Sequence, residues 1–90
     1  MQIRKIMIVD SPIHLWKLLR AKEEIIDTAK EDVAPILIGF MDSVGYYLNG
    51  CKCDEDENYQ EMSDRFAEVK SSKVVDHLVS GFECDGIEFK

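Results

Sequence analysis

The clearest pattern along the chain is a stripe of apolar positions at helical spacing in its middle third. Asp32 stands before the stripe as an N-cap, and Asn49-Gly50 follows it, so the pattern predicts a helix from Val33 to about Leu48. The stripe consists of Val33, Ile36, Leu37, Phe40, Met41, Val44, Tyr47 and Leu48. Its length and regularity predict the central helix of the core.

Two small residues, Gly39 and Ser43, lie one turn apart beside this stripe. A glycine inside a helix costs about 1 kcal/mol relative to alanine, so we expect another backbone to approach closely there in compensation. That backbone belongs either to the same chain or to a second copy. In the second case the protein is a self-assembling structural subunit, such as a homodimer, joined through this face.

The N-terminal third has the pattern of one strand followed by one helix. Ile3–Val9 is short and rich in branched apolar residues, which predicts a mostly buried strand. Ser11 as N-cap and Pro12 at the first helical position then open a helix that reaches about Lys30. Lys22 falls within the apolar stripe of this helix, so its ammonium either extends to solvent or meets a carboxylate from elsewhere in the fold.

The C-terminal half predicts two further helices and a hairpin. Asn58 and Glu61 have the spacing of a capping box for a third helix, and a shift of the apolar face near Ser71 separates it from a short fourth helix. Gly81 ends that helix, and residues 82–89 have the pattern of two small strands around an Asp-Gly turn.

An isolated hairpin of this length is marginally stable, so the N-terminal strand is expected to join it. The predicted fold class is therefore α+β, with about four helices packed on a small sheet made of the N-terminal strand and the C-terminal hairpin. No repeat or linker divides the sequence, which predicts a single domain over residues 1–90.

Charge narrows the classes of partner. The chain has 18 acidic and 11 basic residues among 90, a formal net charge of −7. Such a surface repels nucleic acid phosphates and anionic lipids, so we expect no direct nucleic acid binding, no membrane binding, and a protein partner that is basic or itself binds nucleic acid. Three cysteines, no signal-peptide pattern and no apolar run of 18 residues predict a cytoplasmic protein.

The residues suited to metal binding are few. Cys51, Cys53, His77 and Cys84 are ligand types for a tetrahedral zinc ion, which makes a metal-stabilised regulatory protein an alternative. Their spacing argues against it, because Cys-x-Cys replaces the usual Cys-x-x-Cys and the other two ligands lie on different predicted elements. We therefore expect no cofactor.

Catalytic groups are also lacking in the pattern. The two histidines lie on separate predicted elements, so nothing in the sequence places a base beside a serine or cysteine nucleophile. There is no glycine-rich phosphate loop, and paired carboxylates are too frequent to be diagnostic. The expectation is that the protein is not an enzyme.

Two groups of residues are candidates for partner binding. Ile13 and Trp16 fall on the charged side of the first helix, where a tryptophan ringed by polar groups is typical of interface hot spots. The alternative is that this turn packs against the strand or the C-terminal segment. The acidic run comprises Asp54, Glu55, Asp56 and Glu57. We interpret it as an electrostatic attractant for a basic partner.

These features together predict a small acidic interaction module that binds another macromolecule as an inhibitor or adaptor. Small size, acidic surface and missing catalytic groups are shared by immunity proteins, by anti-restriction and other anti-defence factors, and by viral or phage inhibitors of host proteins. That likeness is one of composition and not of family.

Overall fold

The computed structural model describes residues 4–50 and 55–90, without the side chains of residues 55 and 56. Within these ranges the chain forms two strands and five helices: β1 (Ile6–Val9), α1 (Pro12–Ala21), α2 (Glu24–Asp27), α3 (Ala34–Leu48), α4 (Glu55–Val69), α5 (Ser72–Gly81) and β2 (Gly86–Phe89). The α+β fold class, with both ends of the chain in one small sheet, is confirmed.

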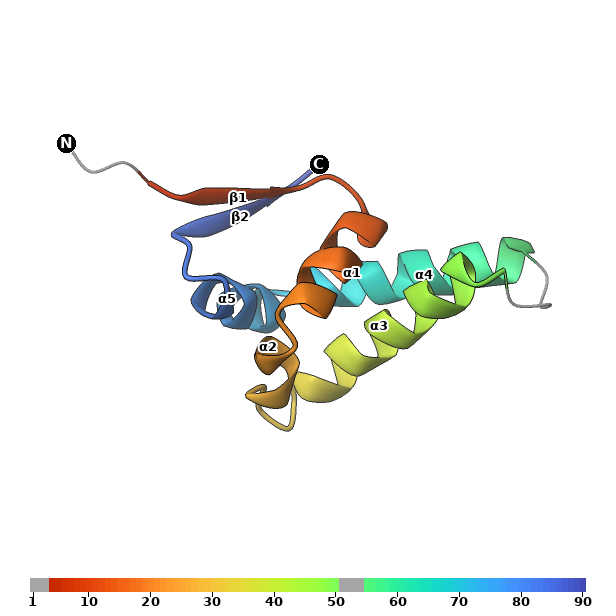
Figure 1. The fold of residues 1–90 in the computed structure, drawn as a ribbon, viewed down its shortest axis with the longest axis horizontal. Helices are drawn as coiled ribbons and strands as arrows, with labels where there is room; N and C mark the ends of the chain where they lie inside the picture. Colours follow the sequence, from red (N-terminus) through yellow and green to blue (C-terminus); the bar gives the residue numbers. More distant parts are fainter. Residues whose placement is uncertain (1–3, 51–54) are drawn as a thin grey trace.

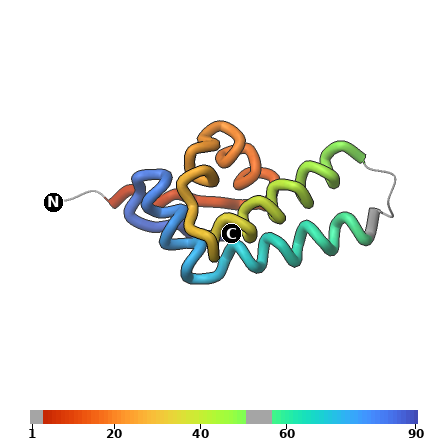
Figure 2. The backbone as a smooth tube through the Cα atoms, turned by 90° about the horizontal axis from the view of Figure 1, so that it is seen from below, coloured from red at the N-terminus to blue at the C-terminus, as the bar shows by residue number. Residues whose placement is uncertain are grey.

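The helices lie on one side of the sheet (Figure 1). α3 and α4 form a long pair that extends away from the sheet, and Figure 2 shows the two running side by side. This pair makes the molecule elongated, with extents of 51 × 27 × 22 Å. β2 lies between β1 and α5 in Figure 1, which leaves β1 at the border of the molecule.

The predicted C-terminal hairpin is wrong, because among the described residues β2 is the only strand there and it pairs parallel with β1. The segment after α5 closes that helix instead. The Cys84 N–H donates to the Val79 carbonyl at 3.1 Å, and the Glu83 N–H donates to the Ser80 carbonyl at 3.2 Å. Glu83, with φ 54°, takes the left-handed conformation that glycine usually supplies in this capping motif. Backbone groups used in the cap are not free to pair in a sheet.

The sheet has one covered and one open face. β1 and β2 are in register from Ile6 opposite Gly86 to Val9 opposite Phe89. Val9 is fully buried, whereas Ile6 and Ile8 are 46% and 47% exposed. The prediction of a mostly buried strand is therefore wrong for every second residue, because helices cover only the opposite face.

The predicted first helix is broken into α1 and α2. Lys22 leaves the helical conformation, with φ −134° and ψ 67°, and the chain turns there. Its Nζ donates a hydrogen bond of 2.7 Å to the carbonyl of Gly81 at the end of α5. Neither predicted role of Lys22 is correct, since the ammonium binds a helix C-terminus, where cations are favoured. The turn lets Leu19 and Ile25 both face the core.

The core joins the sheet to the long helix pair through aromatic contacts. Its fully buried or nearly buried apolar residues are Val9, Leu15, Leu19, Ile25, Val33, Leu37, Phe40, Val44, Met62, Phe66, Val69, Val74 and Leu78. Phe40 of α3 stacks on Phe66 of α4 at 5.9 Å between ring centroids, and Phe66 meets Phe89 of β2 edge-on at 5.8 Å. The central position of α3 is confirmed.

The neighbour of Gly39 and Ser43 belongs to the same chain. Ser43 is buried, and a Cβ added at Gly39 would meet the side chain of Arg65 on α4 at 3.6 Å. The approaching group is thus a flexible side chain and not a backbone. The face that was an alternative site for self-assembly is covered by α4.

The predicted cap of α3 and the predicted start of α4 are wrong, whereas the start of α3 differs from the prediction by one residue. α3 begins at Ala34 with Val33 in the N-cap position and no side-chain cap, and α4 begins at Glu55, which places Asn58 inside the helix. The end of α3 and the break before α5 are confirmed, with Gly50 at φ 60° after α3. The carboxylate of Asp32 does not cap α3 and instead accepts a hydrogen bond from Lys73 at 3.2 Å.

This hydrogen bond from Lys73 lowers the pKa of Asp32 below the ordinary value of an aspartate. Because the pKa is depressed in the folded state, any contribution of the pair to stability is present at neutral pH and fades as the pH falls through the folded-state pKa. In Lys73→Met we expect the pKa of Asp32 to rise toward its ordinary value. A carboxyl-detected NMR titration of both proteins measures this, and equal midpoints would contradict the pairing.

Candidate functional site

Trp16 lies against α3. The sequence analysis considered a binding partner, the N-terminal strand and the C-terminal segment as neighbours of Trp16, but not this helix. Its indole N–H donates a hydrogen bond of 3.1 Å to the carbonyl of Met41, and the guanidinium of Arg20 lies 5.1 Å from the ring centroid. Trp16 and Ile13 are both partly buried against the core. The polar atom of the indole is therefore used within the fold. Partner binding through Ile13 and Trp16 stays a prediction.

The acidic run leads directly into a helix. Asp54 lies outside the described residues, as do the side chains of Glu55 and Asp56, whereas Glu57 is described and exposed in the first turns of α4. Further along the same helix the exposed acidic residues are Glu61, Asp64 and Glu68. Successive steps of four, three and four residues place them on one side of α4 with Glu57. We call these four residues the α4 acidic face.

The sequence interpretation missed most of this face. It placed the start of the helix at Asn58, after the acidic run, so the acidic residues of the helix were not connected to that run. The spacing of Glu57, Glu61, Asp64 and Glu68 was a signal that was present and not used. Because α4 begins at Glu55, the acidic run and the helix surface are continuous.

The electrostatics of the α4 acidic face are dominated by carboxylates. Arg65 pairs with Glu68 at 2.8 Å, and Gln60 donates to a carboxylate oxygen of Asp64 at 2.9 Å. These residues, with Glu57 and Glu61, line an open depression on the helix surface. Arg65 is the one basic residue among the described residues that line it, so the negative charge of this surface is only partly compensated.

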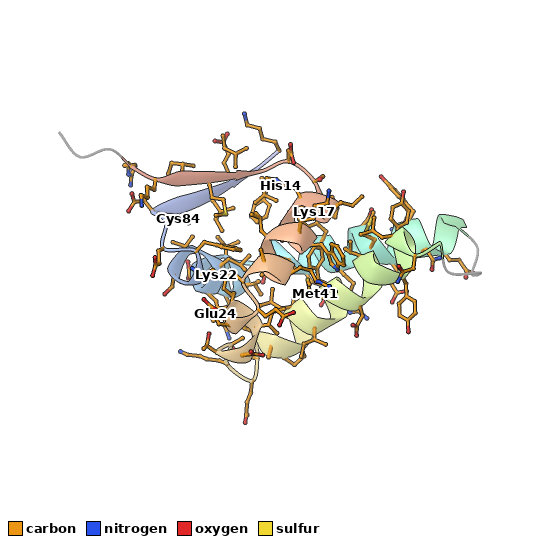
Figure 3. The ribbon with its side chains drawn as sticks, viewed as in Figure 1. His14, Lys17, Lys22, Glu24, Met41 and Cys84 are labelled. Carbon is orange, nitrogen blue, oxygen red and sulfur yellow. The ribbon has the colours of Figure 1, made fainter. Side chains whose placement is uncertain are left out.

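The four candidate zinc ligands are not brought together in the part of the chain that the structure describes. Cys51 and Cys53 lie outside it. His77 places its Nε2 2.7 Å from the carbonyl of Ile25, so this nitrogen acts as a donor and carries the proton. The thiol of Cys84, labelled in Figure 3, points at its own turn, 3.6 Å from the carbonyl of Val79. Residues 4–50 and 55–90 hold no group of three or more metal-ligating side chains.

His14 is the other histidine, and it lies at the first turn of α1 (Figure 3). Its backbone N–H donates to the Ser11 hydroxyl at 3.1 Å, which confirms Ser11 as the N-cap. Its Nδ1 lies 3.0 Å from a carboxylate oxygen of Asp10, whose side chain is 70% exposed. Asp10 precedes the N-cap and His14 lies in the first turn, so this contact lies where β1 passes into α1.

Comparison of the chain with protein-family models, with curated proteins and with solved structures finds no match. None of the helices in the described ranges has the length and apolar run needed to cross a membrane.

Proposed function

We propose that this protein is a small acidic interaction module that binds a basic macromolecule, as an inhibitor or adaptor, through the α4 acidic face. One observation carries the proposal. Four exposed carboxylates lie along one side of a 15-residue helix and continue the acidic run with which the helix begins. A partner that binds nucleic acid offers the complementary surface, because lysines and arginines placed for phosphates also fit carboxylates.

The charge of the whole chain supports this direction of binding. With a net charge of −7 the field of the protein steers cations and basic surfaces toward it and repels polyanions. α4 also fixes where part of this charge lies, because Met62, Phe66 and Val69 anchor the helix in the core. A rigid helix holds the carboxylates in fixed positions, so binding does not require the helix to be ordered first.

The test compares capture of partners from a lysate of the source cells at about 50 and 500 mM salt. We expect a stoichiometric basic protein in native mass spectra at the lower salt and its loss at the higher one, because the Debye length shortens from more than 10 Å to a few Å. A variant with four neutralised side chains, Glu57→Gln, Glu61→Gln, Asp64→Asn and Glu68→Gln, is expected to lose most of this capture at the lower salt.

The matched control neutralises the same number of exposed carboxylates around α2, as Glu23→Gln, Glu24→Gln, Asp27→Asn and Glu31→Gln. It has the same net charge as the α4 variant and should keep the partner. If both variants lost capture of the partner equally, net charge alone would explain the binding, and α4 would not be the binding site. Capture that is insensitive to salt would defeat the electrostatic proposal altogether.

A further inference from the structure

β1 has an unpaired edge. At the two ends of the ladder with β2, the Lys5 carbonyl accepts from the Asp85 N–H and the Val9 carbonyl accepts from the Lys90 N–H, both at 2.8 Å. Backbone groups of alternate residues in a strand point to opposite edges, so those of Ile6 and Ile8 point away from β2. No third strand pairs with this edge within residues 4–50 and 55–90. Such an edge is a template for another strand.

The side chains beside this edge form a self-complementary row. Alternation along the strand places Ile6 and Ile8 on the open face of the sheet, and Arg4 and Asp10 flank the strand two residues before Ile6 and two residues after Ile8. The two isoleucines are almost half exposed, and the two charged residues at the ends are exposed and of opposite sign. We call these four residues the β1 row. In the reverse direction the row still has two isoleucines in the middle, but the acidic residue now comes first and the basic residue last.

We propose that two copies of this protein pair through β1, antiparallel, about a twofold axis at Met7. Ile6 of each copy then lies opposite Ile8 of the other, and Arg4 lies opposite Asp10. Each isoleucine pair exchanges its backbone N–H and C=O groups, and the charged pairs are complementary at both ends. The two sheets become one of four strands, in the order β2-β1-β1-β2.

The charges select both the occupant and the register. A shift of two residues places Arg4 opposite Ile8, or Asp10 opposite Ile6, and loses both charge pairs. A shift of one residue aligns outward-pointing groups with inward-pointing ones and loses the backbone hydrogen bonds. A second copy satisfies every position of the β1 row without any other residue being required. Two strands of four residues bury much less than the roughly 1,200 Å² of a stable interface, so the dimer dissociates on dilution.

The test uses the two charge reversals Arg4→Asp and Asp10→Arg, each made separately in the full chain. Sedimentation equilibrium of the wild type should show an average mass that rises with concentration from 10.3 kDa toward twice that value. Each variant alone places like charges opposite each other at both ends, and should keep the monomer mass where the wild type is mostly dimer. An equimolar mixture of the two places opposite charges together again and should recover the dimer.

Lys30→Asp is the control, since it changes the net charge as Arg4→Asp does but lies far from β1 in the sequence; it should dimerise like the wild type. Ile8→Lys, at an exposed position, is a second variant that should abolish the dimer while leaving the melting of the monomer intact.

A wild type that stays monomeric at millimolar concentration overturns the proposal. So does a dimer that survives both charge reversals, or a mixture that remains monomeric although each variant melts like the wild type. Pairing of β1 with a strand from a different protein, seen as hydrogen-exchange protection of Ile6 and Ile8 only when that protein is added, would also replace the second copy as the occupant.

Discussion

Replacing Phe40 by alanine is expected to lower the free energy of unfolding by about 3–5 kcal/mol. Phe40 is fully buried on α3 and stacks on Phe66, which in turn contacts Phe89 of β2. Its ring therefore fills the region where the long helix pair meets the sheet. A domain of 90 residues has a total stability near 9 kcal/mol at about 0.1 kcal/mol per residue, so this one truncation removes a large share of it.

Urea denaturation of the wild type and the variant, followed by circular dichroism, measures this loss. Ile38→Ala is the matched control, because Ile38 lies on the same helix and is 48% exposed. It should cost less than about 1 kcal/mol, since little apolar area is lost and no cavity forms. Similar losses in the two variants would mean that α3 does not bury the face that contains Phe40.

We expect glycine-to-alanine substitution to lower the stability of the protein at Gly81 and to raise it at Gly39. A Cβ at Gly81 would lie 2.9 Å from Cγ1 of Ile25, whose side chain is 1% exposed and enclosed by the core. Overpacking of this kind typically costs about 1–3 kcal/mol, which outweighs the better helix propensity of alanine. A Cβ at Gly39 would meet only the side chain of Arg65 at 3.6 Å, an ordinary contact. Gly39→Ala should therefore stabilise by about 0.5–1 kcal/mol.

Thermal melting of the two variants beside the wild type measures both changes: the melting temperature should fall in Gly81→Ala and rise in Gly39→Ala. A third protein, Gly81→Ala combined with Ile25→Val, tests the cause, because the smaller side chain makes room for the new methyl group. The combined loss should be smaller than the sum of the two single losses. If Gly81→Ala raised the melting temperature, α2 and α5 would not pack as closely as they do here.

The accuracy of the sequence interpretation differed between elements for physical reasons. α3 was predicted to within one residue of each end, because its apolar stripe is long and regular and a glycine follows it. The first helix was predicted too long, since its stripe continues through Lys22 although the chain turns there to bind Gly81. The start of α4 was placed too late because the capping-box spacing at Asn58 was weighed above the acidic residues that precede it.

The candidate binding surfaces were likewise predicted in part: local sequence patterns were recognised, and features that depend on tertiary contacts were missed. The negative charge and the acidic run were evident from the sequence, but their continuation as the α4 acidic face required the helix to begin at Glu55. The open edge of β1 was hidden by the predicted hairpin, which would have changed both the strand order and the exposure of Ile6 and Ile8. Trp16 was singled out because it falls on the charged side of the first helix, whereas its hydrogen bond to Met41 depends on how α1 packs against α3.

The sequence by itself determined which segments are helical, which of their faces are apolar, and that the two ends of the chain form strands. These properties follow from the spacing of neighbouring residues, so they are visible locally. Only the tertiary structure decided the parallel pairing of the strands, the break at Lys22 and the partner of Gly39. Each of these depends on contacts between distant residues, such as the hydrogen bond that joins Lys22 to Gly81 across 59 positions. The order of residues along one segment carries no information about what will lie beside it.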